Sequence, residues 1–233
     1  GAVFFRLLPD QARLTDVNGR LIDCYTAIRD DVESLADELA RHARRHDKAY
    51  YYRQRERFNS ARRLSGTQRA GLMMYLNKTC FNGLYRENSR GEFNVPMGSY
   101  KKPRVLDLPN LLAVHETLQG VDLGVASFER VLDHAEPGDL VYFDPPYVPV
   151  SATSSFTSYA KGGFGSDLQV RLAQVFAELA QRGCYVMLSN SDCGLVRELY
   201  AGWRIEQVWA PRSINSRADR RGAVPEVVVC SWP

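Results

Sequence analysis

The sequence predicts an α/β protein with a mostly parallel sheet, interrupted by a basic helical segment that ends in a hairpin. Three observations predict this. Apolar strands alternate with amphipathic helices after residue 106, polar residues stand where strands end, and Lys and Arg are concentrated between Asp31 and Arg104. Apolar strands separated by such helices are typical of a sheet covered on both faces, which binds ligands beyond the carboxyl ends of its strands.

The N-terminal part of the chain predicts one strand and one helix. The strand covers residues 12–15 and ends at Asp16, and the helix runs from about Gly19 to Asp30. Asp16 is therefore a polar residue at a strand end. A helix N-cap before Gly19 is the alternative role for it.

The basic segment predicts two further helices. The first lies in DDVESLADELARHARRH, where apolar residues recur at three- and four-residue spacing: Val32, Leu35, Ala36, Leu39 and Ala43. The second covers TQRAGLMMYLNKTC, with Thr67 as its cap. From Phe81 to Pro103 the chain becomes rich in Asn, Gly, Ser and Pro, which favours a protruding hairpin with a turn near residues 88–91.

The α/β alternation lies after residue 106. It consists of a strand near residues 121–127, the apolar strand LVYFD from Leu140, a helix over 166–181 and the apolar strand CYVMLSN from Cys184. The last strand, VPEVVVCSW, follows a basic loop without a crossover helix, so we expect it to pair antiparallel with its neighbour. Three polar residues stand at strand ends: Asp16, Asp144 and Asn190.

Length and composition exclude several classes of protein. The chain has 233 residues, of which 45% are apolar and 24% charged, as in an ordinary globular protein of one or two domains. No run of about 18 apolar residues predicts a membrane-spanning helix, and the first residues do not form a signal peptide. The five cysteines include no CxxC pair, which argues against a disulfide framework and a zinc site and indicates a reducing cytosol.

The positive charge is concentrated in one internal third of the chain. Residues 31–104 contain 16 Lys plus Arg against 8 Asp plus Glu, whereas the rest contains 14 against 19. Such a concentration favours binding to a polyanion, because Lys and Arg that neutralise phosphates release counterions. A solvated helical surface is the alternative explanation.

The stretch LVYFDPPY, residues 140–147, is the most informative one for chemistry. It places the Asp144 carboxylate, two prolines and the Tyr147 ring at the end of a buried strand. One substrate that suits these groups is an adenine amine. That amine is a poor nucleophile, and acceptors at Asp144 and the Pro145 carbonyl can take its two hydrogens. Tyr147 can stack on a base swung out of the duplex. A Pro-Pro turn with a solvated Asp is the alternative.

These motifs resemble those of a known family. DPPY after an apolar strand is typical of amino-directed DNA methyltransferases, and LNKTCFNGLYRENSRGEFNVPMGSYKKP from Leu76 resembles the DNA-contacting hairpin of Dam-type adenine methyltransferases. The resemblance runs nearly end to end and includes TDVN at 15–18, DPPYVPVSATSSFTSY at 144–159, LSNSD at 188–192 and RSI at 212–214. It implies a Rossmann-like catalytic sheet, formed by residues 1–30 and 107–233, with a target-recognition domain inserted at 31–106.

The resemblance also implies roles for individual residues. The pocket for a flipped adenine is formed by Asp144, Pro145, Pro146 and Tyr147, and S-adenosylmethionine supplies the methyl group. No cysteine nucleophile and no metal are needed. Cofactor contacts are expected at Gly1, Asp16, Val17, Ser127, Phe128 and Asp144, with the Asp16 carboxylate accepting hydrogen bonds from the ribose.

The hairpin is expected to contact the DNA. By resemblance, Phe81 enters the base stack, Asn82 faces the orphaned base and Arg86 contacts a guanine. Leu84 and Pro96 face a thymine methyl group, and Lys101 and Lys102 contact phosphates. Burial of Phe81 and Leu84 in a core, and solvation of the lysines, are the alternatives.

Two features depart from the family pattern. The family begins with a segment that carries a Gly-rich loop, and Gly1 corresponds to the last glycine of that loop. The sequence is then either part of a longer protein or an inactive remnant. In addition, Ser99 stands where several relatives carry a basic residue.

We therefore expect a cytoplasmic, monomeric enzyme of bacterial, archaeal or phage origin that methylates adenine N6 in double-stranded DNA, with GATC as the inferred target. Repair marking, restriction protection and phage defence remain open as biological roles. The alternatives are a noncatalytic DNA-binding remnant and a methyltransferase that acts on cytosine N4 or on a protein glutamine. The motif DPPY, in place of SPPY or NPPY, and the basic hairpin argue against the last two.

Overall fold

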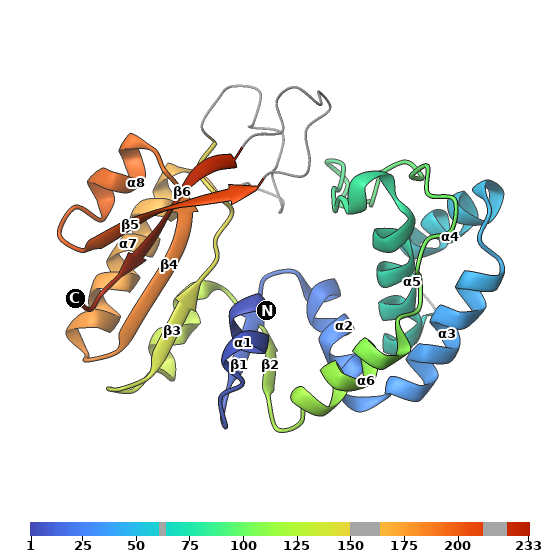
Figure 1. The fold of residues 1–233 in the computed structure, drawn as a ribbon, viewed down its shortest axis with the longest axis horizontal. Helices are drawn as coiled ribbons and strands as arrows, with labels where there is room; N and C mark the ends of the chain where they lie inside the picture. Colours follow the sequence, from blue (N-terminus) through green and yellow to red (C-terminus); the bar gives the residue numbers. More distant parts are fainter. Residues whose placement is uncertain (61–63, 150–163, 212–222) are drawn as a thin grey trace. The chain divides into compact units, whose positions relative to one another are not determined.

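The computed structural model describes residues 1–60, 64–149, 164–211 and 223–233 of the chain. These residues divide into two compact units, residues 1–127 and 128–233 (Figure 1). The expected motifs at residues 150–159 and 212–214 lie outside the described residues. Both units contain helices and strands, so the mixed α/β class predicted from the sequence is confirmed.

The first unit is mostly helical. Its elements are α1 (Ala2–Leu7), β1 (Arg13–Asp16), α2 (Gly19–Asp30), α3 (Val32–Arg44), α4 (Lys48–Ser60), α5 (Gly66–Thr79), the 3-10 turn η1 (Phe81–Gly83), α6 (Leu108–Thr117) and β2 (Asp122–Val125). Strands β1 and β2 pair in parallel, with Asp16 opposite Val125. Helix α2 has the predicted bounds, and the apolar side of α3 is buried at Val32, Leu35 and Leu39.

Helix α5 begins earlier than the sequence indicated. Its N-cap is Ser65, whose hydroxyl accepts a hydrogen bond from the Gln68 N–H while the Gln68 side chain accepts one from the Ser65 N–H. This reciprocal pair is a capping box. Thr67, which we predicted as the cap, lies inside the helix, and its hydroxyl donates to Asp31 at 2.8 Å.

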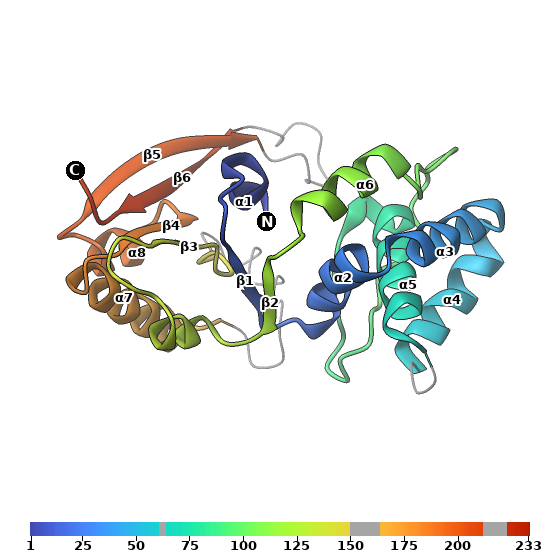
Figure 2. The ribbon, with the colours of Figure 1, turned by 90° about the horizontal axis from the view of Figure 1, so that it is seen from below.

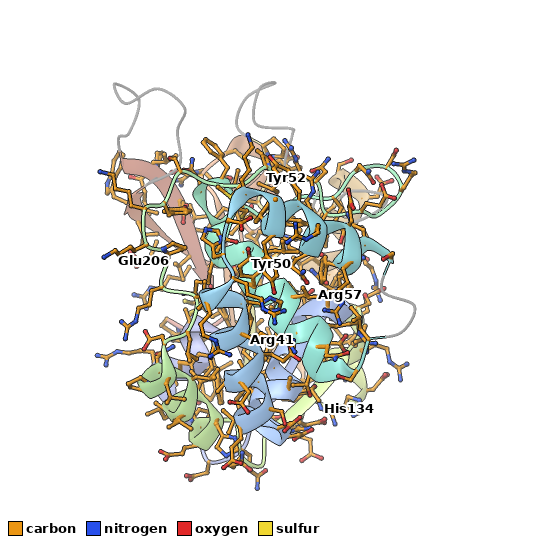
Figure 3. All side chains as sticks on the ribbon, turned by 90° about the vertical axis from the view of Figure 1, so that its right-hand side faces the viewer. Arg41, Tyr50, Tyr52, Arg57, His134 and Glu206 are labelled. Atoms are coloured by element: carbon orange, nitrogen blue, oxygen red, sulfur yellow. The ribbon has the colours of Figure 1, made fainter. Side chains whose placement is uncertain are left out.

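Helix α4 was not predicted, although it contributes Tyr50, Tyr51 and Phe58 to the core of this unit. Figure 3 looks onto this part of the molecule, with Tyr50, Tyr52 and Arg57 on α4 and Arg41 on α3. Tyr50 is buried and its hydroxyl lies 2.8 Å from Nδ1 of His42. Burial, reinforced by the charges of Arg41 and Arg57, lowers the pKa of His42 to about 4, so this imidazole is neutral near pH 7.

The predicted hairpin is present as an irregular antiparallel loop. Backbone pairing joins Cys80 to Met97 and Glu87 to Phe93, and the turn is closed by a hydrogen bond from the Gly91 N–H to the Asn88 carbonyl. The turn is therefore at the predicted position. Gly91 has a φ of 75°, a left-handed conformation that glycine adopts without strain.

The second unit contains a four-stranded sheet. Its elements are the 3-10 turn η2 (Phe128–Asp133), β3 (Leu140–Phe143), α7 (Ser166–Gln181), β4 (Tyr185–Ser191), α8 (Gly194–Leu199), β5 (Arg204–Pro211) and β6 (Ala223–Cys230). The strand order is β3-β4-β6-β5, with β3 and β4 parallel (Figure 2). Strand β6 pairs antiparallel with both β4 and β5, which confirms the prediction for the last strand.

The sheet positions the polar strand ends. Because β3 and β4 run parallel, their carboxyl ends meet at one edge of the sheet, where Asp144 follows β3 and Asn190 is the penultimate residue of β4. Asp16 ends β1, in the other unit. Among the described residues, β1 and β2 form a two-stranded sheet distinct from the four-stranded one. No helix in the described part of the chain is long and apolar enough to span a bilayer.

Candidate functional site

The Asp144 carboxylate lies at the end of β3 and is exposed. Its Oδ1 accepts a hydrogen bond of 3.0 Å from the hydroxyl of Ser189 on β4. The same hydroxyl lies 2.9 Å from the hydroxyl of Tyr142. One carboxylate oxygen is therefore oriented by β4, while the group as a whole stays accessible to a substrate.

The backbone that follows Asp144 is fixed on both sides of Tyr147. The Pro146 carbonyl accepts a hydrogen bond of 3.1 Å from Nε2 of Gln169, on α7. The Val148 N–H donates to Oδ1 of Asn190 at 3.0 Å. The sequence indicated Asn190 as a residue at a strand end, but it did not single out Gln169.

The phenol of Tyr147 stays neutral over a wide pH range. The side chain is half-buried, and burial raises its pKa to about 12. The Ser189 hydroxyl opposes this shift by hydrogen bonding, and the nearby Asp144 carboxylate adds to it. A neutral aromatic ring next to an exposed carboxylate suits a planar, neutral base that offers N–H hydrogens.

The four buried thiols of this protein, Cys24, Cys80, Cys184 and Cys230, are poor nucleophiles. Burial raises the pKa of Cys24 to about 12 and that of Cys80 to about 11. Burial also raises the pKa of Cys184 and Cys230 above the ordinary value. A nucleophilic cysteine requires the opposite shift, because the thiolate is the reactive form.

The segment after β1 offers acceptors and an exposed apolar side chain. Oδ1 of Asp16 accepts a hydrogen bond of 2.7 Å from the Asn18 N–H. Asn18 is the N-cap of α2, because its side chain accepts from the N–H groups of Arg20 and Leu21. The alternative role of Asp16 as that cap is therefore wrong. Val17 is 61% exposed, so a carboxylate and an apolar surface stand side by side, as a nucleoside requires.

The other residues that we predicted to contact the cofactor include Gly1, Ser127 and Phe128. Gly1 is the N-cap of α1, and a Cβ atom there would lie 2.6 Å from the Tyr25 hydroxyl. Ser127 and Phe128 follow β2, and Phe128 is half-buried. The Phe128 ring contacts that of Phe143, the residue before Asp144, edge to face at 6.5 Å.

The hairpin exposes most of the side chains that we predicted to contact DNA. Exposed side chains in this set are Phe81, Asn82, Arg86, Pro96, Lys101 and Lys102. Leu84 is half-buried and packs against the core of the first unit. Phe81 is 46% exposed, so burial in a core is wrong as the alternative explanation for this residue.

The opposite side of the hairpin is packed against α4. Phe93 and Val95 are buried, with 2% and 1% of their surface exposed. The Asn59 side chain pairs with both backbone groups of Phe93, accepting from its N–H at 2.8 Å and donating to its carbonyl at 3.0 Å. The Val95 carbonyl accepts from the Tyr51 hydroxyl at 2.9 Å and from Arg55 at 3.1 Å. Side chains of helix α4 thus form the hydrogen bonds to the hairpin backbone that a neighbouring strand would form in a sheet.

Arg20 of α2 fixes the turn of the hairpin. Its Nη1 donates to the Glu87 carboxylate at 3.0 Å and to the Tyr85 hydroxyl at 3.4 Å, and its Nη2 donates to the Gly91 carbonyl at 3.3 Å. The guanidinium also lies 4.6 Å from the centroid of the Phe58 ring. A planar group with several donors is needed for this set of contacts.

We expect Arg20→Ala to loosen the hairpin. The variant should lower the free energy of unfolding by about 2 kcal/mol, because it removes a half-buried charge-assisted bond to Glu87. Amide hydrogen exchange should accelerate at Gly91 more than in α7. The matched control is Arg90→Ala, whose exposed pair with Glu92 contributes about 0–1 kcal/mol. Equal effects of the two variants would contradict the anchoring role.

Comparisons with known proteins agree with this chemistry. Residues 1–214 match the model of the family described as D12 class N6 adenine-specific DNA methyltransferase. The chain is 40% identical over 236 residues to a type II methyltransferase of Lactococcus lactis, an alignment that covers 100% of this chain and 83% of the relative. It is 41% identical over 234 residues to a type II methyltransferase of Methanocaldococcus jannaschii, covering 95% and 81%. It is 35% identical over 239 residues to the DNA adenine methylase of Escherichia coli, covering 100% and 84%.

Proposed function

We propose a mechanism and a target from the premise that this chain belongs to the D12 class of N6 adenine-specific DNA methyltransferases. The chain is thus related to enzymes that methylate adenine in DNA. We propose that it acts on double-stranded DNA as a monomer, with S-adenosylmethionine as the methyl donor and GATC as the target. The observation that carries the proposal is the loop 144–148, where an exposed carboxylate and a half-buried, neutral tyrosine are fixed at the end of a strand.

The residues of this loop activate the adenine amine. When bound, the cofactor supplies an electrophilic methyl group on a sulfonium. The Asp144 carboxylate and the Pro145 carbonyl accept the two N6 hydrogens, which concentrates the nitrogen lone pair for attack on the methyl carbon. On accepting the methyl group from the bound cofactor, N6 would give up one proton, for which Asp144 is an acceptor. Tyr147 stacks on the flipped base, and Pro146 restricts the backbone.

Asp16 is the main protein ligand that we propose for the cofactor. Its carboxylate accepts hydrogen bonds from the ribose hydroxyls, and Val17 packs on the adenine ring. The exposure of Val17 and the ordered carboxylate of Asp16 support this assignment. Further contacts come from Gly1, Ser127, Phe128 and Asp144.

We propose the domain organisation that the family resemblance implies. Residues 1–30 and 107–233 form a Rossmann-like catalytic domain, and residues 31–106 form the target-recognition domain. The parallel pairing of β1 with β2 and of β3 with β4 supports the first assignment. Within the second, the exposed hairpin residues Phe81, Asn82 and Arg86 recognise bases, with Leu84 and Pro96 at thymine methyl groups and Lys101 and Lys102 at phosphates.

Incubation with radiolabelled S-adenosylmethionine and a GATC-containing duplex tests the proposed function. We expect label in the DNA and N6-methyladenine as the only methylated base after hydrolysis to nucleosides. N4-methylcytosine, or label in protein, would support one of the other amino-directed activities. Calorimetric titration with the cofactor distinguishes a noncatalytic DNA-binding protein, because only the enzyme binds the methyl donor. Absence of label, with an active full-length relative assayed in parallel, would contradict the proposal.

A further inference from the structure

Helix α7 carries one polar residue on a face that is otherwise apolar. Its buried side chains are Leu172, Val175, Phe176 and Leu179, which pack into the core of the second unit. Gln169 lies on the same face, three residues before Leu172, and is only 1% exposed. A buried amide is costly unless its hydrogen bonds are satisfied, and an apolar residue would serve the packing equally well.

Both polar groups of the Gln169 amide form hydrogen bonds. Both connect it to the loop 144–148, one directly and the other through Asn190. Nε2 donates to the Pro146 carbonyl at 3.1 Å, and Oε1 accepts from Nδ2 of Asn190 at 3.1 Å. Oδ1 of Asn190 in turn accepts from the N–H groups of Val148, at 3.0 Å, and Ser191, at 2.8 Å. The two amides thus form a bridge between the backbone groups on either side of Tyr147.

The orientation of each amide in this bridge follows from its partners. The Pro146 carbonyl can only accept, so the NH2 group of Gln169 must face it. The carbonyl of Gln169 then faces Asn190, whose NH2 group must donate to it. The N–H groups of Val148 and Ser191 can only donate, so they face the remaining Asn190 oxygen. The network is therefore specific to glutamine and asparagine at these positions.

We propose that Gln169 is a positioning residue for methyl transfer, acting through the Gln169–Asn190 bridge. It touches neither the base nor the methyl donor. It fixes the peptide groups that flank Tyr147, and through them the direction of the Tyr147 ring, the Pro145 carbonyl and the Asp144 carboxylate. This inference rests on the proposed function of that loop. Misplacement of reacting groups by about 1 Å lowers a rate by about a hundredfold, which sets the expected scale.

Two substitutions test the bridge. Gln169→Glu replaces only the NH2 group by oxygen. Its ionised carboxylate keeps the acceptor for Asn190 and places an oxygen against the Pro146 carbonyl. A protonated carboxyl would instead donate to that carbonyl, so the rate of this variant is measured over a range of pH. Gln169→Met keeps the length and suits the apolar surroundings but removes both polar contacts. The matched control is Gln174→Met, the same change at an exposed position of the same helix.

The readouts are single-turnover methyl-transfer rates, dissociation constants for duplex and cofactor, and the thermal unfolding midpoint. We expect both Gln169 variants to transfer methyl about ten- to a hundredfold more slowly, with both dissociation constants within about twofold of the wild type. Gln174→Met should have the same methyl-transfer rate and the same dissociation constants as the wild type.

Several results would overturn the inference. These are rates within twofold of the wild type, an equal loss in Gln174→Met, or weaker DNA binding that accounts for the slower turnover. If Gln169→Met fails to fold, the isosteric Gln169→Glu decides, and loss of folding in both variants would show a role in stability in place of positioning. An inactive wild type would count against the proposed function, whereas an active wild type with unaffected variants would count against the bridge alone.

Discussion

Replacing Asp144 with alanine is expected to lower the rate of methyl transfer by at least about a thousandfold and to leave DNA affinity within about twofold. Loss of a group aligned with the charge that develops in the transition state costs about a hundred- to a thousandfold, and loss of a proton acceptor adds to it. The side chain is exposed and accepts one hydrogen bond from Ser189, so the free energy of unfolding should change by only about 1 kcal/mol.

Two further variants make this test specific. Asp144→Asn keeps one oxygen acceptor but loses the charge, so its rate should lie between those of the wild type and Asp144→Ala. Asp167→Ala removes an exposed carboxylate from the first turn of α7 and should leave the rate unchanged. Single-turnover assays with labelled cofactor give the rates, and fluorescence anisotropy of a labelled duplex gives the affinity. Turnover by Asp144→Ala at more than a tenth of the wild-type rate would refute the assigned role.

Sequence patterns predicted the elements whose signals are local. Helix α7 has the predicted bounds because its apolar residues recur along one face, and the turn at Asn88 is marked by its composition. Helix α4 was missed because its buried residues, Tyr50, Tyr51 and Phe58, leave most of the helix polar and form no regular stripe. Tertiary packing, which a local pattern does not contain, stabilises that helix.

The same distinction applies to the site. Asp144 and Tyr147 were predicted because the motif that contains them is contiguous. Gln169 and Arg20 were missed because their partners are distant in sequence: Gln169 is 23 residues from Pro146, and Arg20 is 67 residues from Glu87. The available signals were a polar residue on the apolar face of α7 and an arginine just after a helix cap, and neither identifies its partner before the fold is known.

Arg86 is the residue for which we expect the largest effect on sequence preference. It is exposed on the hairpin, and its Nε donates to Oδ1 of Asn94 at 2.8 Å. That bond uses Nε, whereas an arginine that recognises guanine uses a pair of N–H donors toward O6 and N7. Asn94 thus restricts the guanidinium before DNA is bound, which lowers the entropic cost of a bidentate contact.

Sequence preference is measured as the ratio of two kcat/KM values, one for a cognate duplex and one for a duplex with one substituted guanine. Arg86→Ala should lower this ratio by about ten- to a hundredfold, which corresponds to about 1–3 kcal/mol. Lys101→Ala is the matched control, because a phosphate contact carries no sequence information. That variant should weaken binding to both duplexes equally and reduce the salt dependence by about one charge, with the ratio unchanged. For Asn94→Ala, the ratio should lie between those of Arg86→Ala and Lys101→Ala, since this variant keeps the guanidinium but removes its restraint. Equal ratios in the wild type and Arg86→Ala would assign recognition of the guanine to another residue, whereas a fall in the ratio for Lys101→Ala would place that lysine at a base edge.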